Sequence, residues 1–328
     1  MSRITCGTEQ SGTLDHRVIR PMKLTLAVDG PLDAAATLAR YHRWGEDPTT
    51  RVDGDVLRRV LRLGERLIPY DVQAQGTVDD ARLAVTVADG GGADVERAVT
   101  TEVRRLYGLD FDLVGFYRMA KADPALAPLV EPLYGMRPTL APTALEMLVG
   151  SISAQQVNLS FAFACRARLV RRWGTPVTTP GGEVWAFPTP SRLAATRLRE
   201  YRALKFSTRK GEYIRDVARA IVRGTLDLEA LMAAPSPDVI ATLTALRGLG
   251  RWTADWFLAR CCGRGDICPA GDLAVRKAFE HHWARRGRTL SEAAIRRRSR
   301  TWGEHQNIAV HYLLAGMRLH AAARGGEA

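Results

Sequence analysis

Two segments near the start of the chain alternate between apolar and polar residues. Every second residue is apolar in residues 23–29, and the same period returns at Leu83, Val85 and Val87. A two-residue period is typical of a strand with one buried face. The sequence therefore predicts two β-strands in this part of the chain.

A helical period follows the second predicted strand. After the glycines at 90–92, apolar residues recur three or four positions apart in residues 93–107, at Val95, Val99, Val103 and Leu106. Residues 56–63 are compatible with either a helix or a strand. We expect an α+β domain over residues 22–113 with an antiparallel sheet, preceded by a flexible extension over residues 1–21.

Beyond residue 113 the pattern is almost entirely helical. A capping box is predicted from Thr143 to Glu146, and Ser236 followed by Pro237 predicts another helix start. Gly181 and Gly182, and the segment 188–190, are expected to form loops. We expect a helical domain over residues 142–264 and a second helical subdomain built from residues 114–141 and 265–328.

The net charge of the chain indicates what kind of partner it binds. The 328 residues carry a formal net charge of +12, and the excess lies after residue 100, where the net charge is +14. A basic surface favours a polyanion such as nucleic acid, although an arginine-rich coding bias would give the same excess. The sequence contains no apolar run long enough to predict a membrane span, and its start does not resemble a secretion signal. The five cysteines are too irregularly spaced to predict a disulfide framework or a metal site. A reducing cytoplasm is expected.

Residues 243–255, LTALRGLGRWTAD, predict two helices joined by a short glycine hairpin. Gly248 and Gly250 permit backbone angles that a β-carbon disfavours, and the second helix begins with amide hydrogens that no helical carbonyl accepts. The helix dipole adds to this attraction for an anion. A DNA phosphate would fit there, while a plain tight turn between two helices is the simpler alternative.

Asp272 follows Pro-Ala-Gly and begins another apolar-periodic helix. An aspartate at that position is typically an N-cap, and helix amides also favour its charged form. A capping role and a catalytic role for this anion are compatible. Asp255 is interpreted as a solvated or structural residue, and Asp266 as a loop residue.

These motifs together resemble the helix-hairpin-helix DNA glycosylases, and most closely the DNA-3-methyladenine glycosylase II (AlkA) type. The similarity includes the hairpin over residues 243–261, the aspartate that follows it, and segments 142–157, 187–194 and 210–226. It covers about residues 22–320. The resemblance implies an α+β fold in which the N-terminal antiparallel sheet with its helices precedes a mostly α-helical glycosylase core of two subdomains.

The resemblance also implies an activity, the hydrolysis of the N-glycosidic bond of a damaged base after the nucleotide has been flipped out of the duplex. Asp272 takes the position of the catalytic aspartate. Trp252 stands where bifunctional relatives carry the lysine that attacks the sugar, which implies a monofunctional enzyme. The implied reaction requires no cofactor, and the expected substrates are alkylated purines of the 3-methyladenine and 7-methylguanine type.

The resemblance assigns further residues by position. Trp252 and Trp256 would offer aromatic faces to a cationic base, with Tyr41 and His305 as further base-pocket residues, His305 standing where the bacterial prototype has a tryptophan. Gln156 replaces an apolar plug, and Arg247 replaces a hairpin proline. The implied DNA-binding residues are Gln155, Gln156, Arg247, Gly248, Gly250 and Thr253, and the main-chain carbonyls of Thr244, Leu246 and Leu249 match a site for Na⁺ or K⁺.

Several alternatives stay open at this point. The same fold acts on deaminated or oxidised purines in other enzymes, and a lesion-binding protein without turnover would share these motifs. Arg296, Arg297, Arg298 and Arg300, which follow a capping box predicted from Thr289 to Glu292, form either a solvated helix face or a set of phosphate contacts. The expected partner is double-stranded DNA with damaged bases, and the expected state is a monomer.

Overall fold

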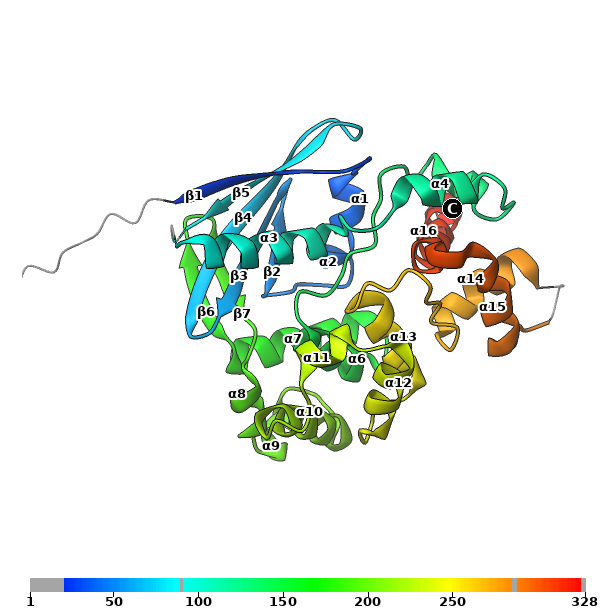
Figure 1. Ribbon diagram of the computed structural model, residues 1–328. Coiled ribbons are helices and arrows are strands. Elements are labelled where there is room, and N and C mark those ends of the chain that lie inside the picture. Colours follow the sequence, from blue (N-terminus) through cyan, green and yellow to red (C-terminus); the bar gives the residue numbers. More distant parts are fainter. Residues whose placement is uncertain (1–20, 89–90, 285–287, 326–328) are drawn as a thin grey trace, which may run out of the picture.

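A five-stranded antiparallel sheet forms the first part of the computed structural model, which describes residues 21–88, 91–284 and 288–325 (Figure 1). Its spatial order is β1-β5-β4-β3-β2. The predicted alternation is confirmed, since Leu83, Val85 and Val87 are at most 1% exposed, and residues 56–63 form a strand. The strands are β1 (Met22–Ala27), β2 (Thr50–Asp53), β3 (Val56–Leu63), β4 (Arg66–Gly76) and β5 (Ala81–Val87).

Helix α3 (Ala93–Tyr107) packs on this sheet and has the bounds that the helical period predicts. Its residues Val95, Val99, Val103 and Leu106 are fully buried in the core that they share with the sheet. The short helices α1 (Ala34–Leu38) and α2 (Arg40–Arg43) lie between β1 and β2 in sequence. Residues 1–20 of the expected extension lie outside the described residues.

The second part contains the helices that carry the hairpin. Its apolar core is formed by residues from Ala144 to Cys261. The elements are α6 (Ala144–Ala154), α7 (Leu159–Trp173), α8 (Pro190–Ala194), α9 (Leu198–Ala203), α10 (Thr208–Val222), α11 (Leu228–Ala233), α12 (Ser236–Ala245) and α13 (Arg251–Arg260).

A β-hairpin within this part corrects the expectation of an all-helical region. Strands β6 (Thr175–Thr179) and β7 (Gly182–Ala186) pair antiparallel, so Gly182 begins a strand instead of lying in a loop. Val184 and Ala186 are buried against Val60 of β3. Each strand is only five residues long and has few apolar positions, so the local sequence shows no clear two-residue period. The hairpin is stabilised by its contact with the distant sheet.

The third part joins two stretches that are far apart in the sequence. Its core contains residues from Leu113 to Met136 and from Cys268 to Ala315. The exact domain boundaries at 113, 141 and 264 stay a prediction. Of the helices in the described residues, none combines the length and apolar character that crossing a membrane requires. The elements are α4 (Leu113–Ala120), α5 (Ala127–Val130), α14 (Leu273–Trp283), α15 (Glu292–Ser299), the 3-10 helix η1 (Arg300–His305) and α16 (Gln306–Gly325).

Two predicted helix starts are wrong by one or two residues. Pro235 occupies the N-cap of α12, so Ser236 lies inside the helix and its side chain makes no capping bond. The side chain of Ser291, and not that of Thr289, caps α15. In both cases several adjacent residues are suitable caps or breakers, so the local sequence does not single out the first helical residue.

A buried ion network joins the first two parts. Arg59 of β3 donates to Glu102 at 2.9 Å and to Glu146 of α6 at 3.1 Å. Arg166 of α7 pairs with the other oxygen of Glu146 at 2.8 Å and with Asp47 at 2.5 Å. The carboxylate of Glu146 is therefore used in this network, while its backbone N–H donates to the hydroxyl of Thr143. Of the two hydrogen bonds expected in the capping box, only this one forms. All the charges are paired, as buried charges must be.

Candidate active site and nucleic-acid interface

Asp272 is the N-cap of α14, as predicted, and its carboxylate accepts four hydrogen bonds. Oδ1 accepts from the backbone N–H groups of Ala274 at 2.8 Å and Val275 at 3.1 Å. Oδ2 accepts from the indole Nε1–H of Trp252 at 2.7 Å and of Trp256 at 3.1 Å. The side chain is half-buried. Its orientation is thus set by two helices at once.

The two tryptophans lie one turn apart on α13, so they project from the same face of the helix. Trp256 is half-buried against the core of the third part, and Trp252 is also half-buried. The sequence predicted aromatic faces at these positions, whereas the structure adds a second property, because both indole N–H groups donate to Asp272. The i, i+4 spacing followed by an aspartate was the only local signal of this arrangement.

The hairpin between α12 and α13 contains two glycines of different character. Gly248 has φ +87°, and a β-carbon there would lie 2.3 Å from the ring of Tyr213, so both the angle and the space require glycine. Gly250 has φ −123°, and nothing lies within 4 Å of its β-carbon position. The expectation of a special backbone angle is therefore confirmed for Gly248 and wrong for Gly250.

The first turn of α13 presents unpaired amide groups. The first helical bond joins the N–H of Ala254 to the carbonyl of Gly250, so the preceding N–H groups have no partner within the helix. Gly250 offers no side-chain cap. Gly250 and Arg251 are exposed, whereas Thr253 is only 1% exposed and its side chain is not at the surface. This end of α13 is suited to a phosphate.

Arg247 lies at the exposed edge of the hairpin. Its guanidinium pairs with Glu212 at 2.8 Å and stacks on Tyr213, 5.5 Å from the ring centre, while its side chain stays 64% exposed. Because an exposed ion pair of this kind contributes little to stability, Arg247 is free to exchange Glu212 for a phosphate.

The loop between α6 and α7 is tied to the hairpin. Gln155 Nε2–H donates to the carbonyl of Gly248 at 2.7 Å, so this predicted DNA-binding side chain is used internally. Gln156 is exposed and has φ +54°, an uncommon angle for a residue other than glycine. Val157, Leu159 and Phe161 are 37–42% exposed beside it, an apolar surface that the sequence analysis missed.

Lys210 contacts the end of α6, just before the same loop. Its ammonium group donates to the carbonyl of Ser153 at 2.8 Å, and burial lowers the pKa of Lys210. Two hydrogen bonds to other parts of the fold, from the Gln155 side chain to Gly248 and from Lys210 to the carbonyl of Ser153, therefore fix the backbone just before Gln156.

Asp255 is fully buried and pairs with Arg251 at 2.8 Å and with Arg296 at 2.5 Å. Its structural interpretation is confirmed. A solvated helix face is wrong for Arg296, and also for Arg298, which binds Asp123 at 2.8 Å. Arg297 and Arg300 are exposed.

Tyr41 and His305, the two further base-pocket residues that the resemblance implies, are packed among other side chains. Tyr41 is 8% exposed in the core of the first part, and His305 packs against Phe116 with ring centres 6.4 Å apart. Within the described residues, no ring pair or hydrogen bond joins Tyr41 or His305 to Trp252, Trp256 or Asp272.

The three hairpin carbonyls that the resemblance assigns to a cation site differ in whether they accept a hydrogen bond. The Leu246 carbonyl accepts from the N–H of Leu249 at 3.0 Å. Within the described part of the chain, the carbonyls of Thr244 and Leu249 accept no hydrogen bond. Oxygen donors of this type suit a hard cation. Across the same residues, no group of three or more His, Cys, Asp or Glu side chains is placed to hold a metal ion.

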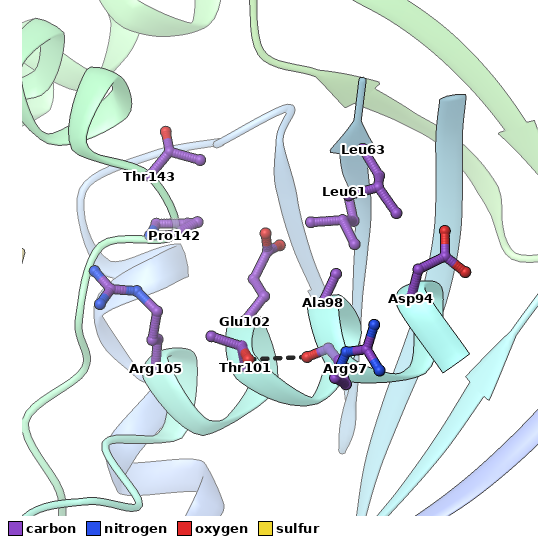
Figure 2. Close-up of a pocket in the computed structure, with 10 residues that line it drawn as sticks. All are labelled: Leu61, Leu63, Asp94, Arg97, Ala98, Thr101, Glu102, Arg105, Pro142 and Thr143. Atoms are coloured by element: carbon purple, nitrogen blue, oxygen red, sulfur yellow. Dashed lines mark hydrogen bonds between the residues drawn. The ribbon is translucent and has the colours of Figure 1, made fainter. Parts of the chain in front are cut away.

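A shallow pocket of about 500 Å³ lies elsewhere, between α3, β3 and the segment that leads into α6 (Figure 2). The carboxylate of Glu102 points into it, and Arg105 extends toward Pro142. None of the predicted site residues lines it. Its lining residues are Leu61, Leu63, Asp94, Arg97, Ala98, Thr101, Glu102, Arg105, Pro142 and Thr143.

Comparisons with known proteins agree with this fold. The family model of the HhH-GPD superfamily of base excision DNA repair proteins matches residues 149–304. A 3-methyladenine DNA-glycosylase structure from Archaeoglobus fulgidus superposes with a TM-score of 0.80 at 24% identity, covering 90% of this chain and 98% of that chain. An 8-oxoguanine glycosylase/lyase from Clostridium acetobutylicum, bound to double-stranded DNA, superposes with a TM-score of 0.72 at 18% identity, covering 94% and 100%.

A sequence relative makes the family assignment specific. A DNA-3-methyladenine glycosylase from Bacillus subtilis is 32% identical over 283 residues, which cover 86% of this chain and 92% of that protein. With the glycine hairpin and the capped aspartate in place, the chain belongs to the DNA-3-methyladenine glycosylase family of helix-hairpin-helix DNA repair enzymes.

Proposed function

We propose that this DNA glycosylase is monofunctional and releases alkylated purines, of the 3-methyladenine and 7-methylguanine type, from double-stranded DNA to leave an abasic site. The observation that carries the proposal is the carboxylate of Asp272, held on one oxygen by the indole N–H groups of Trp252 and Trp256. An anion fixed in this way stabilises positive charge that develops next to it.

The chemistry follows from the charge of the substrate. An N-alkylated purine carries a positive charge, so when its glycosidic bond breaks, the electron pair stays with the base, which leaves neutral and needs no proton. The sugar becomes an oxocarbenium-like cation, which Asp272 stabilises. Water then adds to the anomeric carbon and loses its proton to the carboxylate or to solvent.

Aromatic faces beside this anion favour the same substrates. A cationic base over an indole ring gains about 0.5–2 kcal/mol from the cation–π interaction. Trp252 and Trp256 provide such rings next to Asp272. An alkylated purine would thus be selected by its charge in addition to its weakened pairing, which lowers the cost of flipping.

The absence of a lysine at the position that a lyase requires supports hydrolysis without strand cleavage. A lyase needs an amine at the sugar, and Trp252 occupies the position of that lysine in bifunctional relatives. Lys210, a partly buried lysine, donates to the carbonyl of Ser153 and supports the α6–α7 loop instead.

The proposed DNA contacts divide between backbone and side chains. The amide groups at Gly250 and in the first turn of α13 would hold a phosphate, with Arg247 beside them. Gln156 would fill the gap that the flipped base leaves, as a polar plug next to the exposed apolar side chains. Tyr41 and His305 have no role in this proposal. The protein would act as a monomer in the cytoplasm, where the DNA is.

No cofactor takes part in the proposed chemical step. We propose a structural Na⁺ or K⁺ at the hairpin, because in the described part of the chain the carbonyls of Thr244 and Leu249 accept no hydrogen bond and that of Leu246 has a second lone pair. A bound cation would add positive charge where a phosphate docks.

The test is a base-release assay on dimethyl-sulfate-treated duplex DNA. We expect the native chain to release 7-methylguanine and 3-methyladenine, Asp272→Asn to release at least a hundredfold less, and Asp266→Asn, which changes an exposed turn residue, to behave as the native chain. Release of no alkylated base by the native chain would reject the proposal.

Two further substrates and one binding measurement separate the alternatives. Release of hypoxanthine or 8-oxoguanine from defined duplexes, with no release of alkylated bases, would assign a different lesion class. Tight lesion binding with no abasic product, even in large enzyme excess, would identify a sensor. Strand cleavage after base release, trapped by borohydride reduction, would show a bifunctional enzyme.

A further inference from the structure

His311 of α16 lies against one of the two tryptophans that hold the catalytic carboxylate. Its ring centre is 6.1 Å from that of Trp256, and the two planes meet at 85°. Trp256 in turn donates to Asp272 at 3.1 Å. A single indole ring therefore separates this imidazole from the site, although no pattern in the sequence marked it.

Hydrogen bonding fixes the tautomer of His311. Its Nδ1 lies 2.9 Å from the main-chain carbonyl of Asn307. A carbonyl only accepts, so Nδ1 must carry the proton, and the neutral ring has a bare Nε2. Asn307 is itself fully buried, and its side-chain amide donates to the carbonyls of Ala259 and Arg264.

The surroundings oppose a second proton on this ring. Burial, and then the positive charges of Arg40 on α2 and Arg318 on α16, lower the pKa of His311 to about 4, while the bond to Asn307 acts in the opposite direction. The charged group that Trp256 itself contacts is the carboxylate of Asp272. At neutral pH the imidazole next to Trp256 is uncharged.

We propose that His311 is a specificity-determining residue, which acts through Trp256 as a neutral ring and so allows a positively charged purine to bind beside Asp272. This inference rests on the proposed function. A positive charge placed at His311 would lie close to the Trp256 ring, whose centre is 6.1 Å from that of the imidazole, and therefore close to a base stacked on that ring. Repulsion over that distance in a partly buried site would weaken binding of a cationic base by tenfold or more, and binding of a neutral base far less.

Three variants separate charge from shape. His311→Lys adds a charge, His311→Gln stays neutral and keeps an N–H donor, and Leu319→Lys adds the same charge to the same helix at a side chain that is 43% exposed. The measurement is the ratio of Kd values for duplexes with guanine and with 7-methylguanine, both carrying a 2′-fluorine that prevents cleavage.

We expect the native chain to prefer 7-methylguanine, His311→Gln and Leu319→Lys to keep that preference within about twofold, and His311→Lys to lose at least tenfold of it. Equal losses in His311→Lys and His311→Gln would show a role of shape and overturn the inference, as would an unchanged preference in His311→Lys. In either case the native preference, and with it the proposed function, would stand. A native chain without preference would reject the proposed function and the inference with it.

A measurement on the native chain covers the case in which His311→Lys fails to fold. The ¹⁵N chemical shifts of the His311 ring should report a protonated Nδ1 and an unprotonated Nε2 between pH 5.5 and 8. An imidazolium with two N–H groups in that range would overturn the inference without any variant.

Discussion

The side-chain amide of Gln155 donates a hydrogen bond of 2.7 Å to the main-chain carbonyl of Gly248. This bond joins the loop that presents Gln156 to the hairpin that would hold a phosphate. The proposed phosphate site and the proposed plug are therefore joined directly, and a change at Gln155 should alter DNA processing more than folding.

Gln155→Glu tests this coupling. A carboxylate cannot donate, so it would face the Gly248 carbonyl as a second acceptor, and a lost neutral hydrogen bond costs about 1 kcal/mol. We expect a five- to tenfold lower single-turnover rate on alkylated duplex DNA, with the thermal midpoint almost unchanged.

The matched control is Gln73→Glu, which removes an exposed hydrogen bond to Asp55 in the sheet with the same change of charge. It should leave the rate within twofold of the native value. If both variants are slowed equally, added negative charge and not the lost bond is the cause.

Gly248 and Gly250 provide a second matched pair. Gly248→Ala places a β-carbon 2.3 Å from the ring of Tyr213 on a backbone with φ +87°, whereas Gly250→Ala meets open space at an ordinary angle. We expect Gly248→Ala to lower the free energy of unfolding by about 2 kcal/mol or more and to weaken binding to undamaged duplex at least tenfold.

Gly250→Ala should change the stability by no more than about 1 kcal/mol. Chemical denaturation and fluorescence anisotropy at fixed salt give the two readouts. Equal stability losses in the two variants would contradict the assignment of strain to Gly248 alone.

The parts of the site that sequence reasoning could predict are those with local causes. The hairpin glycine and the N-cap of α14 each follow from a few adjacent residues, because turn geometry and capping are short-range. The ring of Tyr213 beneath Gly248 and the contact of His311 with Trp256 depend on residues from other helices. No periodicity within one segment encodes such contacts.

The same distinction holds for the fold. Helix α3 could be placed to the residue, since its apolar stripe reports the surface on which it packs. The β6–β7 hairpin was missed, because Val184 and Ala186 owe their burial to Val60, more than 120 residues earlier. Tyr41 was assigned to the pocket by position in a family, and its place in the core of the first part could not be predicted from the local sequence.

The indole N–H groups at Asp272 should matter for the rate and not for DNA affinity. Trp256→Phe keeps an aromatic face and removes the donor at 3.1 Å, and Trp252→Phe removes the donor at 2.7 Å. Hydrogen bonds to a charged group contribute about 1.5–3 kcal/mol, so each variant should slow single-turnover base release by about tenfold or more.

Trp302→Phe is the control for these variants, since Trp302 also donates an indole N–H to an aspartate, Asp123, at 2.8 Å, in the core of the third part. It should lower the thermal midpoint and leave the rate constant unchanged. Native rates in both Trp252→Phe and Trp256→Phe would remove the indole donors from the mechanism.

The junction between the first two parts should respond to acid through Asp47. Burial raises the pKa of this carboxyl, but the 2.5 Å ion pair with Arg166 and the hydroxyl of Thr49 at 2.7 Å outweigh burial, so the pKa lies below its ordinary value of 3.8. The folded state therefore holds the charged form more strongly than the unfolded chain does. The stabilisation is fully present above the unfolded value and is lost as the pH falls through the folded pKa.

Asp47→Asn should accordingly lower the free energy of unfolding by about 3 kcal/mol at pH 7, because it leaves Arg166 with one buried partner fewer. The difference from the native chain should shrink as the pH falls from 4 towards 2. Asp80→Asn breaks an exposed pair with Arg82 and should show no measurable difference at any pH. Urea denaturation at a series of pH values measures both curves, and a difference between native and Asp47→Asn that stays constant down to pH 2 would show that Asp47 is not the titrating group.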